Sequence, residues 1–305
     1  MKYFYYCLFF LLCTIGYAQE QKYSSYFDLN YFTGNIANHN NDILHLIQGH
    51  PEGVVLGWNK KTFGYEAWEQ RYNYPDIGVS FTYQDLKNDV LGNNYGIYGH
   101  CNFYFFKRHL MFRTGQGLAY TSNPYDKYDN SRNNAFGTSI MSSTYVMLNY
   151  KKEHIFDRFG LQGGLSLIHY SNANVKAPNS SINSLTINVG LTYSLDEFEP
   201  EYKRDIRDGG KEKFTEPIKY NLAFRTGINE SDVVGSGQFP FYVFSGYADK
   251  RLSHKSAIHL GADVFFSNFL KELIHYKSVS FPEENVPGNE DYKRAGSFIG
   301  HELFI

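Results

Sequence analysis

Apolar and polar residues alternate along many short stretches of this chain. In residues 161–171 and 183–192 the odd positions are mostly apolar and the even positions are mostly small or polar. Successive side chains of a strand point to opposite faces, so both stretches predict β-strands with one apolar face. Further strands are expected at 77–83, 220–227 and 258–264, at about 95–106, 110–120, 140–150, 241–248 and 296–305, and more weakly before residue 68.

The beginning of the chain has the pattern of an export signal. Residues 1–18 combine the early Lys2, a long apolar run and the small residue Ala18. This pattern predicts a secretory signal peptide that is removed after Ala18, which leaves residues 19–305 as a single barrel domain. The remaining chain contains no apolar run of the roughly 18 residues that a membrane helix needs.

The composition of the chain indicates which kind of all-β protein to expect. The sequence has 27 Tyr and 26 Phe, an aromatic share of 18%, and its mean hydropathy is −0.44. Export, abundant aromatic residues and alternating strands together predict an antiparallel transmembrane β-barrel of about 12 strands in the bacterial outer membrane. A secreted β-sandwich is the alternative, and it explains the aromatic excess less well. The net charge of −2 gives no reason to expect a nucleic-acid partner.

Two segments bear on how the barrel is completed. Residues 196–217 are densely charged and are interpreted as a solvated barrel loop in preference to an interdomain linker. Residues 300–305 lack the terminal aromatic residue usual in such barrels, so closing strands are expected to be missing after Ile305. Arg113, Arg225 and Asp263 are expected to line the polar interior.

Three polar residues occupy apolar faces and are the candidates for chemistry. His169 and Ser171 share the face of Leu165, and Asn183 shares the face of Leu185. Polar groups placed among lipid-facing apolar residues are unfavourable without partners. A Ser-His-Asn hydrolytic site that meets its substrate in the membrane accounts for all three. The alternative is a His and a Ser in the aromatic girdle, where polar tips meet lipid headgroups.

Each of these residues has a defined chemical role in that hypothesis. Ser171 is the nucleophile, His169 is the base that takes its proton, and Asn183 orients the imidazole. An antiparallel hairpin would bring Asn183 alongside His169. The loop at 172–179 is rich in side-chain amides, from which we expect the oxyanion donors, with Asn179 preferred and Asn174 as a second candidate.

A short motif around these residues carries a family resemblance. It comprises His169-Tyr170-Ser171-Asn172-Ala173, then Lys176, Pro178-Asn179 and Ile182, with looser matches at Gly49-His50-Pro51, Trp68, Pro75-Asp76-Ile77-Gly78 and 115–120. This motif resembles the lipid A 3-O-deacylase family of outer-membrane barrels, which removes an ester-linked acyl chain through a Ser-His-Glu triad. The resemblance implies His169 as base, Ser171 as nucleophile and Asn179 as oxyanion donor. Two positions depart from the family, since Asn183 stands where it has Glu and Asn174 where it tends to have Gly.

A second family resembles the same segment. Outer membrane phospholipase A uses His-x-Ser-Asn with a catalytic Asn at this spacing, and its members are barrels of about twelve strands that use calcium and dimerise. Ala173 and the Pro178-Asn179 pair favour the deacylase. The sequence therefore predicts an esterase acting on lipid A of lipopolysaccharide without cofactor or metal. A phospholipase that uses calcium and forms a homodimer is the runner-up, and a non-catalytic pore or scaffold is the rival from another class.

Overall fold

The computed structural model describes residues 22–204, 214 and 216–304, so the expected signal peptide at 1–18 lies outside the described residues. The described residues form twelve antiparallel strands in two sheets. Eight strands close into a barrel: β1 Ser24–Ile36, β2 Glu52–Lys61, β3 Asp76–Asp85, β4 Asn93–Phe105, β5 Leu110–Thr121, β6 Ile140–Phe156, β7 Phe159–Ser171 and β8 Ile182–Ser194. The second sheet is open and contains β9 Lys219–Asn229, β10 Phe239–Arg251, β11 Ser256–Ser267 and β12 Lys293–Leu303.

The all-β antiparallel prediction is confirmed, but a single barrel of about 12 strands is wrong. The barrel closes after eight strands because β8 pairs with β1 in continuous register from Tyr26↔Ser194 to Ile36↔Ser184. The charged stretch at 196–217, interpreted from sequence as a barrel loop, instead lies between β8 and β9, which belong to different sheets. The strands were thus located correctly, while the pairing that closes the ring was not.

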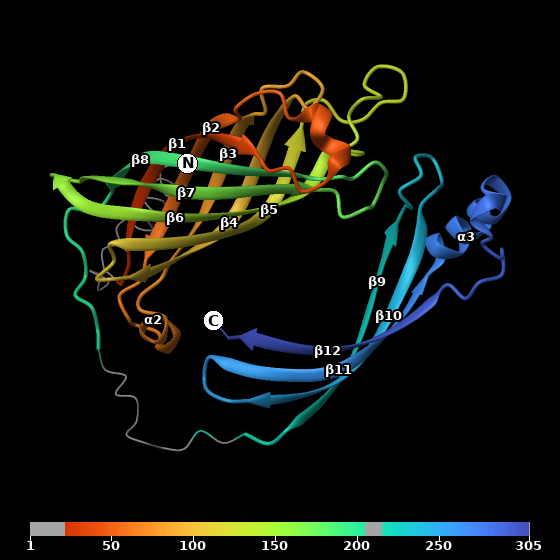
Figure 1. Ribbon diagram of the computed structural model, residues 1–305. Coiled ribbons are helices and arrows are strands. Elements are labelled where there is room, and N and C mark those ends of the chain that lie inside the picture. The colour runs from red at the N-terminus through yellow and green to blue at the C-terminus, as the bar shows by residue number, and fades with distance from the viewer. Residues whose placement is uncertain (1–21, 205–213, 215, 305) are drawn as a thin grey trace, which may run out of the picture.

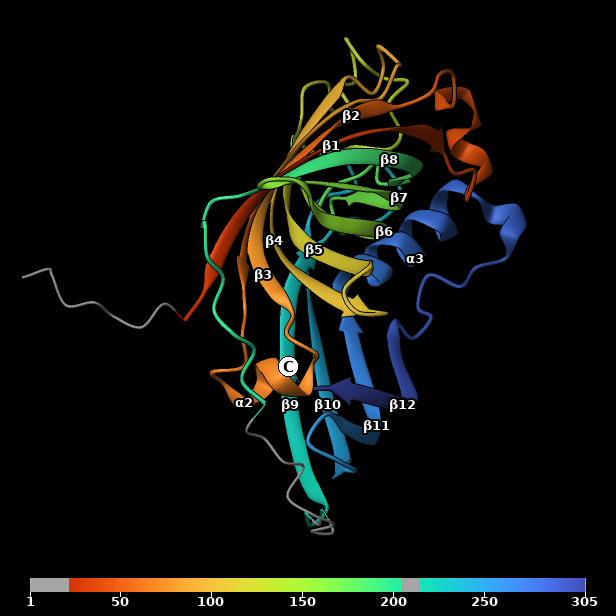
Figure 2. The ribbon, with the colours of Figure 1, turned by 90° about the vertical axis from the view of Figure 1, so that its left-hand side faces the viewer.

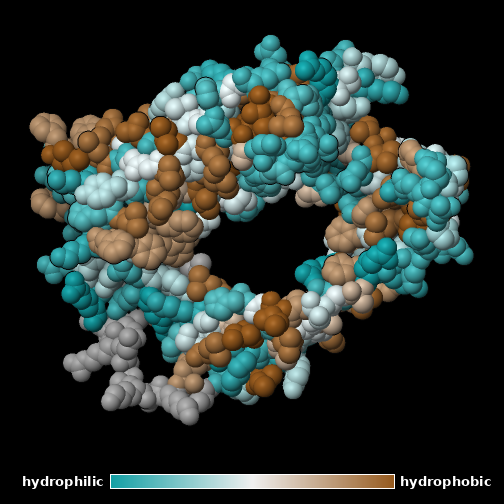
Figure 3. Space-filling model, in the orientation of Figure 1, coloured by the Kyte–Doolittle hydropathy of each residue, from teal (hydrophilic) through white to brown (hydrophobic). Residues whose placement is uncertain are grey.

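A buried polar network fills the barrel. Arg113 is fully buried, and its two terminal nitrogens donate to the two carboxylate oxygens of Asp28 at 3.0 and 2.7 Å. Asn59 and Asn102 accept further hydrogen bonds from the same guanidinium group. A small barrel filled by side chains in this way has no open channel. Long apolar residues such as Ile97 and Leu118 point outward and are exposed, and Figure 3 shows hydrophobic residues over the outside of the barrel.

The four-stranded sheet repeats this alternation without closing. Leu222 and Phe224 are exposed on one face, whereas Arg225 on the other face pairs with Asp263 at 2.8 Å. The sequence placed these two charged residues in the barrel interior, and that was wrong, because their strands pair only within the second sheet. Arg113 alone of the three lies inside the barrel.

Short helices accompany both sheets. They are η1 Asn41–Leu46, α2 Ala67–Arg71, α3 Asn268–Ser280 and η2 Pro282–Glu284. Among the described residues, none of the helices has both the length and the apolar character needed to cross a bilayer. Figure 1 shows the second sheet across an open space from the barrel, with the β9–β10 turn near the loop that follows β7. Figure 2, turned by 90°, shows α2 beside the lower part of the second sheet and α3 above β11 and β12.

Candidate active site

His169 and Asn183 meet on the outer face of the barrel. The two residues are directly paired across β7 and β8. Their chain neighbours Ile168, Tyr170 and Ser184 are buried in the interior, so His169 and Asn183 point the other way, as the alternation predicts. The imidazole Nδ1 lies 2.7 Å from Asn183 Oδ1. An amide oxygen only accepts, so Nδ1 carries the ring proton and Nε2 is left with a free lone pair for a proton.

Ser171 is the last residue of β7 and is held by the loop that follows. Its Oγ accepts from the side-chain nitrogen of Asn179 at 2.9 Å and from the backbone N–H of Ala173 at 3.1 Å. The structure therefore brings Asn183 to His169 and Asn179 to Ser171. A hydrogen bond between His169 and Ser171 is not among the contacts of the described residues, although the two share one strand face.

The loop at 172–179 is shaped by internal hydrogen bonds. The backbone N–H of Asn172 donates to Asn179 Oδ1 at 3.0 Å, which turns the Asn179 nitrogen toward Ser171. That nitrogen also donates to Asn174 Oδ1 at 2.8 Å. Two donors, the Asn179 amide and the Ala173 backbone N–H, thus converge on the hydroxyl. Both donors therefore lie next to the atom that would attack an ester, which is the region where an oxyanion would form.

Asn174 has a different place from the one expected. Its side-chain oxygen holds Asn179, so it supports the donor at Ser171 instead of facing Ser171 itself. Its φ of 57° is in the left-handed region, as is the φ of 55° at Ala173. Glycine adopts this conformation freely, and Asn tolerates it better than most residues. Asn174 can therefore keep the backbone turn that Gly would form at this position.

A groove of about 580 Å³ lies on the outside of the barrel. Its apolar lining includes Leu165, Leu185 and Ile187, which share the outward faces of His169 and Asn183. Thr33, Gly34, Asn35 and His50 complete the other side of the groove. Leu185 is two positions from Asn183 on the same face of β8, so the groove lies along the strands from the His169–Asn183 pair.

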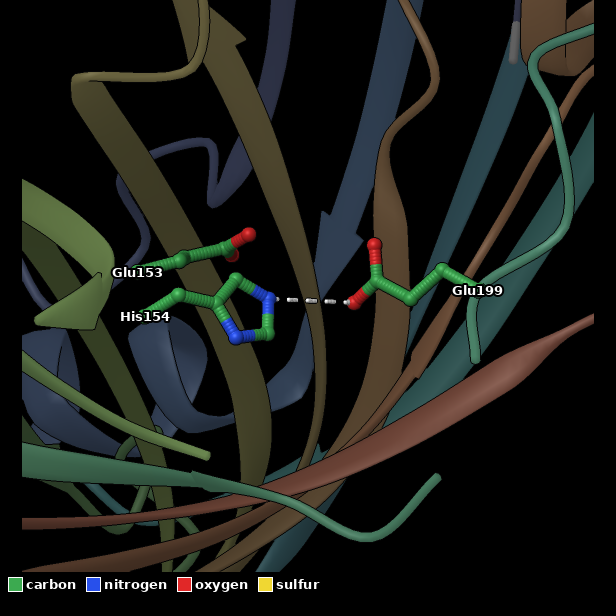
Figure 4. A group of neighbouring side chains, drawn as sticks. All are labelled: Glu153, His154 and Glu199. Carbon is green, nitrogen blue, oxygen red and sulfur yellow. Dashed lines mark ion pairs between the residues drawn. The ribbon is translucent and has the colours of Figure 1, made fainter. Parts of the chain in front are cut away.

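A group of possible metal ligands lies at the opposite end of β7. Figure 4 shows Glu153, His154 and Glu199, whose ligand atoms lie within 4.8 Å of one another. The Lys61 ammonium already contacts both carboxylates, at 2.7 and 2.6 Å, and Lys151 contacts Glu153 at 2.8 Å. These ammonium groups occupy the place of a cation. That the protein needs no cofactor or metal stays a prediction.

One residue at the site has no counterpart in the sequence-based prediction. The carboxylate of Glu230, in the turn between β9 and β10, accepts from the backbone N–H of Ala177 at 2.8 Å. Glu230 is buried. An acidic residue in a polar turn is ordinary, so no local signal distinguishes it, and only the long-range contact does.

Comparison with known proteins extends this picture. Residues 52–192 match the family model described as lipid A 3-O-deacylase (PagL). This match confirms the resemblance found in the sequence and the predicted location in the bacterial outer membrane. The matched range runs from the first residue of β2 into β8, and it leaves out β1 and the four-stranded sheet. A search of curated proteins gives no match.

Three solved structures are similar to part of this chain. The outer membrane enzyme PagL is 18% identical with a TM-score of 0.37, covering 53% of this chain and 97% of that one. Neisserial surface protein A is 12% identical with a TM-score of 0.28, covering 56% and 96%. Outer membrane protein AlkL is 11% identical with a TM-score of 0.28, covering 60% and 95%.

Proposed function

We propose, on the basis of the lipid A 3-O-deacylase family match of residues 52–192, that this protein is an outer-membrane serine esterase that hydrolyses the 3-position acyl ester of lipid A. The observation that carries the proposal is the hydrogen bond of 2.7 Å between His169 and Asn183 on the lipid-facing wall. It leaves the imidazole Nε2 free to act as a base on the strand face that also carries Ser171.

The reaction proceeds in two steps. His169 Nε2 takes the hydroxyl proton while Ser171 Oγ attacks the ester carbonyl, and the Asn179 amide with the Ala173 N–H stabilises the oxyanion. Collapse of this intermediate breaks the ester bond, and the protonated imidazole gives its proton to the departing lipid A hydroxyl. Water, deprotonated by His169, then hydrolyses the acyl-enzyme and releases the fatty acid.

The substrate class follows from where the site lies. The groove lined by Leu165, Leu185 and Ile187 opens on the outer face of the barrel, two positions along β8 from Asn183. An acyl chain of an outer-leaflet lipid can lie in it without leaving the hydrocarbon layer.

A phospholipase is the second candidate, and one observation favours it. Asn183 is neutral where the deacylase family has Glu, and the outer membrane phospholipase A resemblance includes Asn in this role. That function would involve calcium and a homodimer. A pore has less support, because the Asp28–Arg113 pair and its neighbours fill the interior of the barrel.

The test compares purified protein with its Ser171→Ala variant on two substrates in detergent micelles. We expect release of 3-hydroxy fatty acid from lipid A by the parent protein alone, unchanged by a calcium chelator. Calcium-dependent hydrolysis of phosphatidylethanolamine, with lipid A left intact, would replace the deacylase by the phospholipase. Equal rates for parent and variant would exclude Ser171 as the nucleophile.

A further inference from the structure

The turn between β9 and β10 is in direct contact with the loop that holds Ser171. Besides the bond from Ala177, the backbone N–H of Glu230 donates to the carbonyl of Asn174 at 2.9 Å. The side chain of Gln238 donates to the carbonyl of Val175 at 2.7 Å. Three hydrogen bonds thus join the turn at 230–238 to residues 174–177.

Hydrogen bonds within the turn at 230–238 stabilise its conformation. The second carboxylate oxygen of Glu230 accepts from the backbone N–H of Gly237 at 3.2 Å, which ties the two ends of the turn together. The hydroxyls of Ser231 and Ser236 are hydrogen-bonded to each other at 2.7 Å. One carboxylate therefore links a closed turn to the loop after β7. At 5% exposure, Glu230 is shielded from the water that would otherwise compete for these bonds.

The loop after β7 needs such support. Ala173 and Asn174 both have left-handed backbone conformations, which most L-residues adopt at a cost of about 1–2 kcal/mol and Asn at a smaller cost. Asn174 holds Asn179, and Asn179 contacts Ser171. A shift of the backbone at 174–177 would therefore move the donor at the nucleophile.

We propose that Glu230 is a positioning residue for the esterase site. The β9–β10 turn of the second sheet holds the loop at 172–179, which carries the oxyanion donors, in the geometry that the reaction needs. The inference rests on the proposed function. It makes the activity of the barrel depend on a sheet outside the range that matches the family. Glu230 acts through Ala177 and Asn174 and does not contact the ester.

The experiment measures kcat and KM on lipid A for the full chain and three variants. Glu230→Ala removes both acceptors, and we expect kcat to fall by about 10- to 100-fold with KM within twofold, since a displaced oxyanion donor affects the transition state more than the bound ester. Glu230→Gln keeps one acceptor oxygen, so its kcat should recover to within about fivefold of the parent. Asp249→Ala is the matched control, because Asp249 accepts from Asn221 at the other end of the same strands.

Amide hydrogen exchange supplies a second measurement that does not depend on turnover. In Glu230→Ala, exchange across 172–179 should become at least tenfold faster, with the barrel strands unchanged. Unchanged exchange, or faster exchange with an unchanged kcat, would overturn the inference. If the parent protein hydrolyses no ester while exchange in 172–179 still responds to Glu230→Ala, the proposed function fails, although Glu230 does hold the loop. The two failures are therefore distinguishable.

Discussion

Replacement of Asn183 by Ala tests the role of the third member of the proposed triad. The change removes the acceptor that lies 2.7 Å from His169 Nδ1. Without it the imidazole can rotate and can place its proton on either nitrogen, so a smaller fraction of molecules presents a basic Nε2 to Ser171. The fold is unaffected, because Asn183 lies on the outer face and its backbone pairing with His169 remains.

The expected size of the effect follows from this single bond. A hydrogen bond to a group that becomes charged contributes about 1.5–3 kcal/mol, and each 1.36 kcal/mol is a tenfold change in rate. Asn183→Ala should therefore lower kcat by roughly 10- to 150-fold and leave KM nearly unchanged, because the acyl chain binds elsewhere. The assay is steady-state hydrolysis of lipid A in mixed micelles.

A matched control lies on the other side of the same histidine. Thr144 is paired with His169 across β6 and β7, and its hydroxyl donates to Gln116. Thr144→Val should keep kcat within twofold. A kcat for Asn183→Ala equal to that of the parent, with Thr144→Val also unchanged, would refute the assignment of Asn183 as the residue that orients His169.

Three further predictions follow from the same geometry. Asn183→Asp places a carboxylate beside Nδ1, which stabilises the imidazolium, so kcat should rise at least about tenfold; a lower kcat in kinetic assays would contradict this role. Leu185→Trp fills the groove and removes packing contacts with the acyl chain, so KM should rise, measured with esters of different chain length; an unchanged KM would place the acyl chain elsewhere. Arg113→Met leaves the Asp28 carboxylate buried without its cation, which should lower the free energy of unfolding by about 3–5 kcal/mol, measured by urea unfolding. The double variant that also carries Asp28→Leu should recover most of that loss. Equal stability of the single and double variants would contradict this role of the ion pair.

The strands and the outward direction of the site were accessible from sequence, because both depend on local alternation. Residues 161–171 and 183–192 show which side chains share a face, and the antiparallel hairpin then brings Asn183 to His169. The placement of Asn179 near Ser171 also follows from a short loop. Each of these relations spans fewer than about 20 residues.

Closure of the barrel was not accessible in the same way. It depends on pairing between β1 and β8, which are far apart in the chain, and alternation has the same pattern in a strand of either sheet. Arg225 and Asp263 illustrate the point, because they look like interior residues and do lie on a polar face, but of the open sheet. The contact of Glu230 with Ala177 is equally long-range, and the sequence of the turn that contains Glu230 does not indicate it.

The most direct test of the account is mass spectrometry of lipid A from cells that express the full-length protein, beside cells that express Ser171→Ala or His169→Ala. The account predicts that lipid A loses one 3-hydroxyacyl mass with the parent protein and remains intact with either variant. Intact lipid A in all three, with the parent protein folded in the outer membrane, would contradict the proposed deacylase activity.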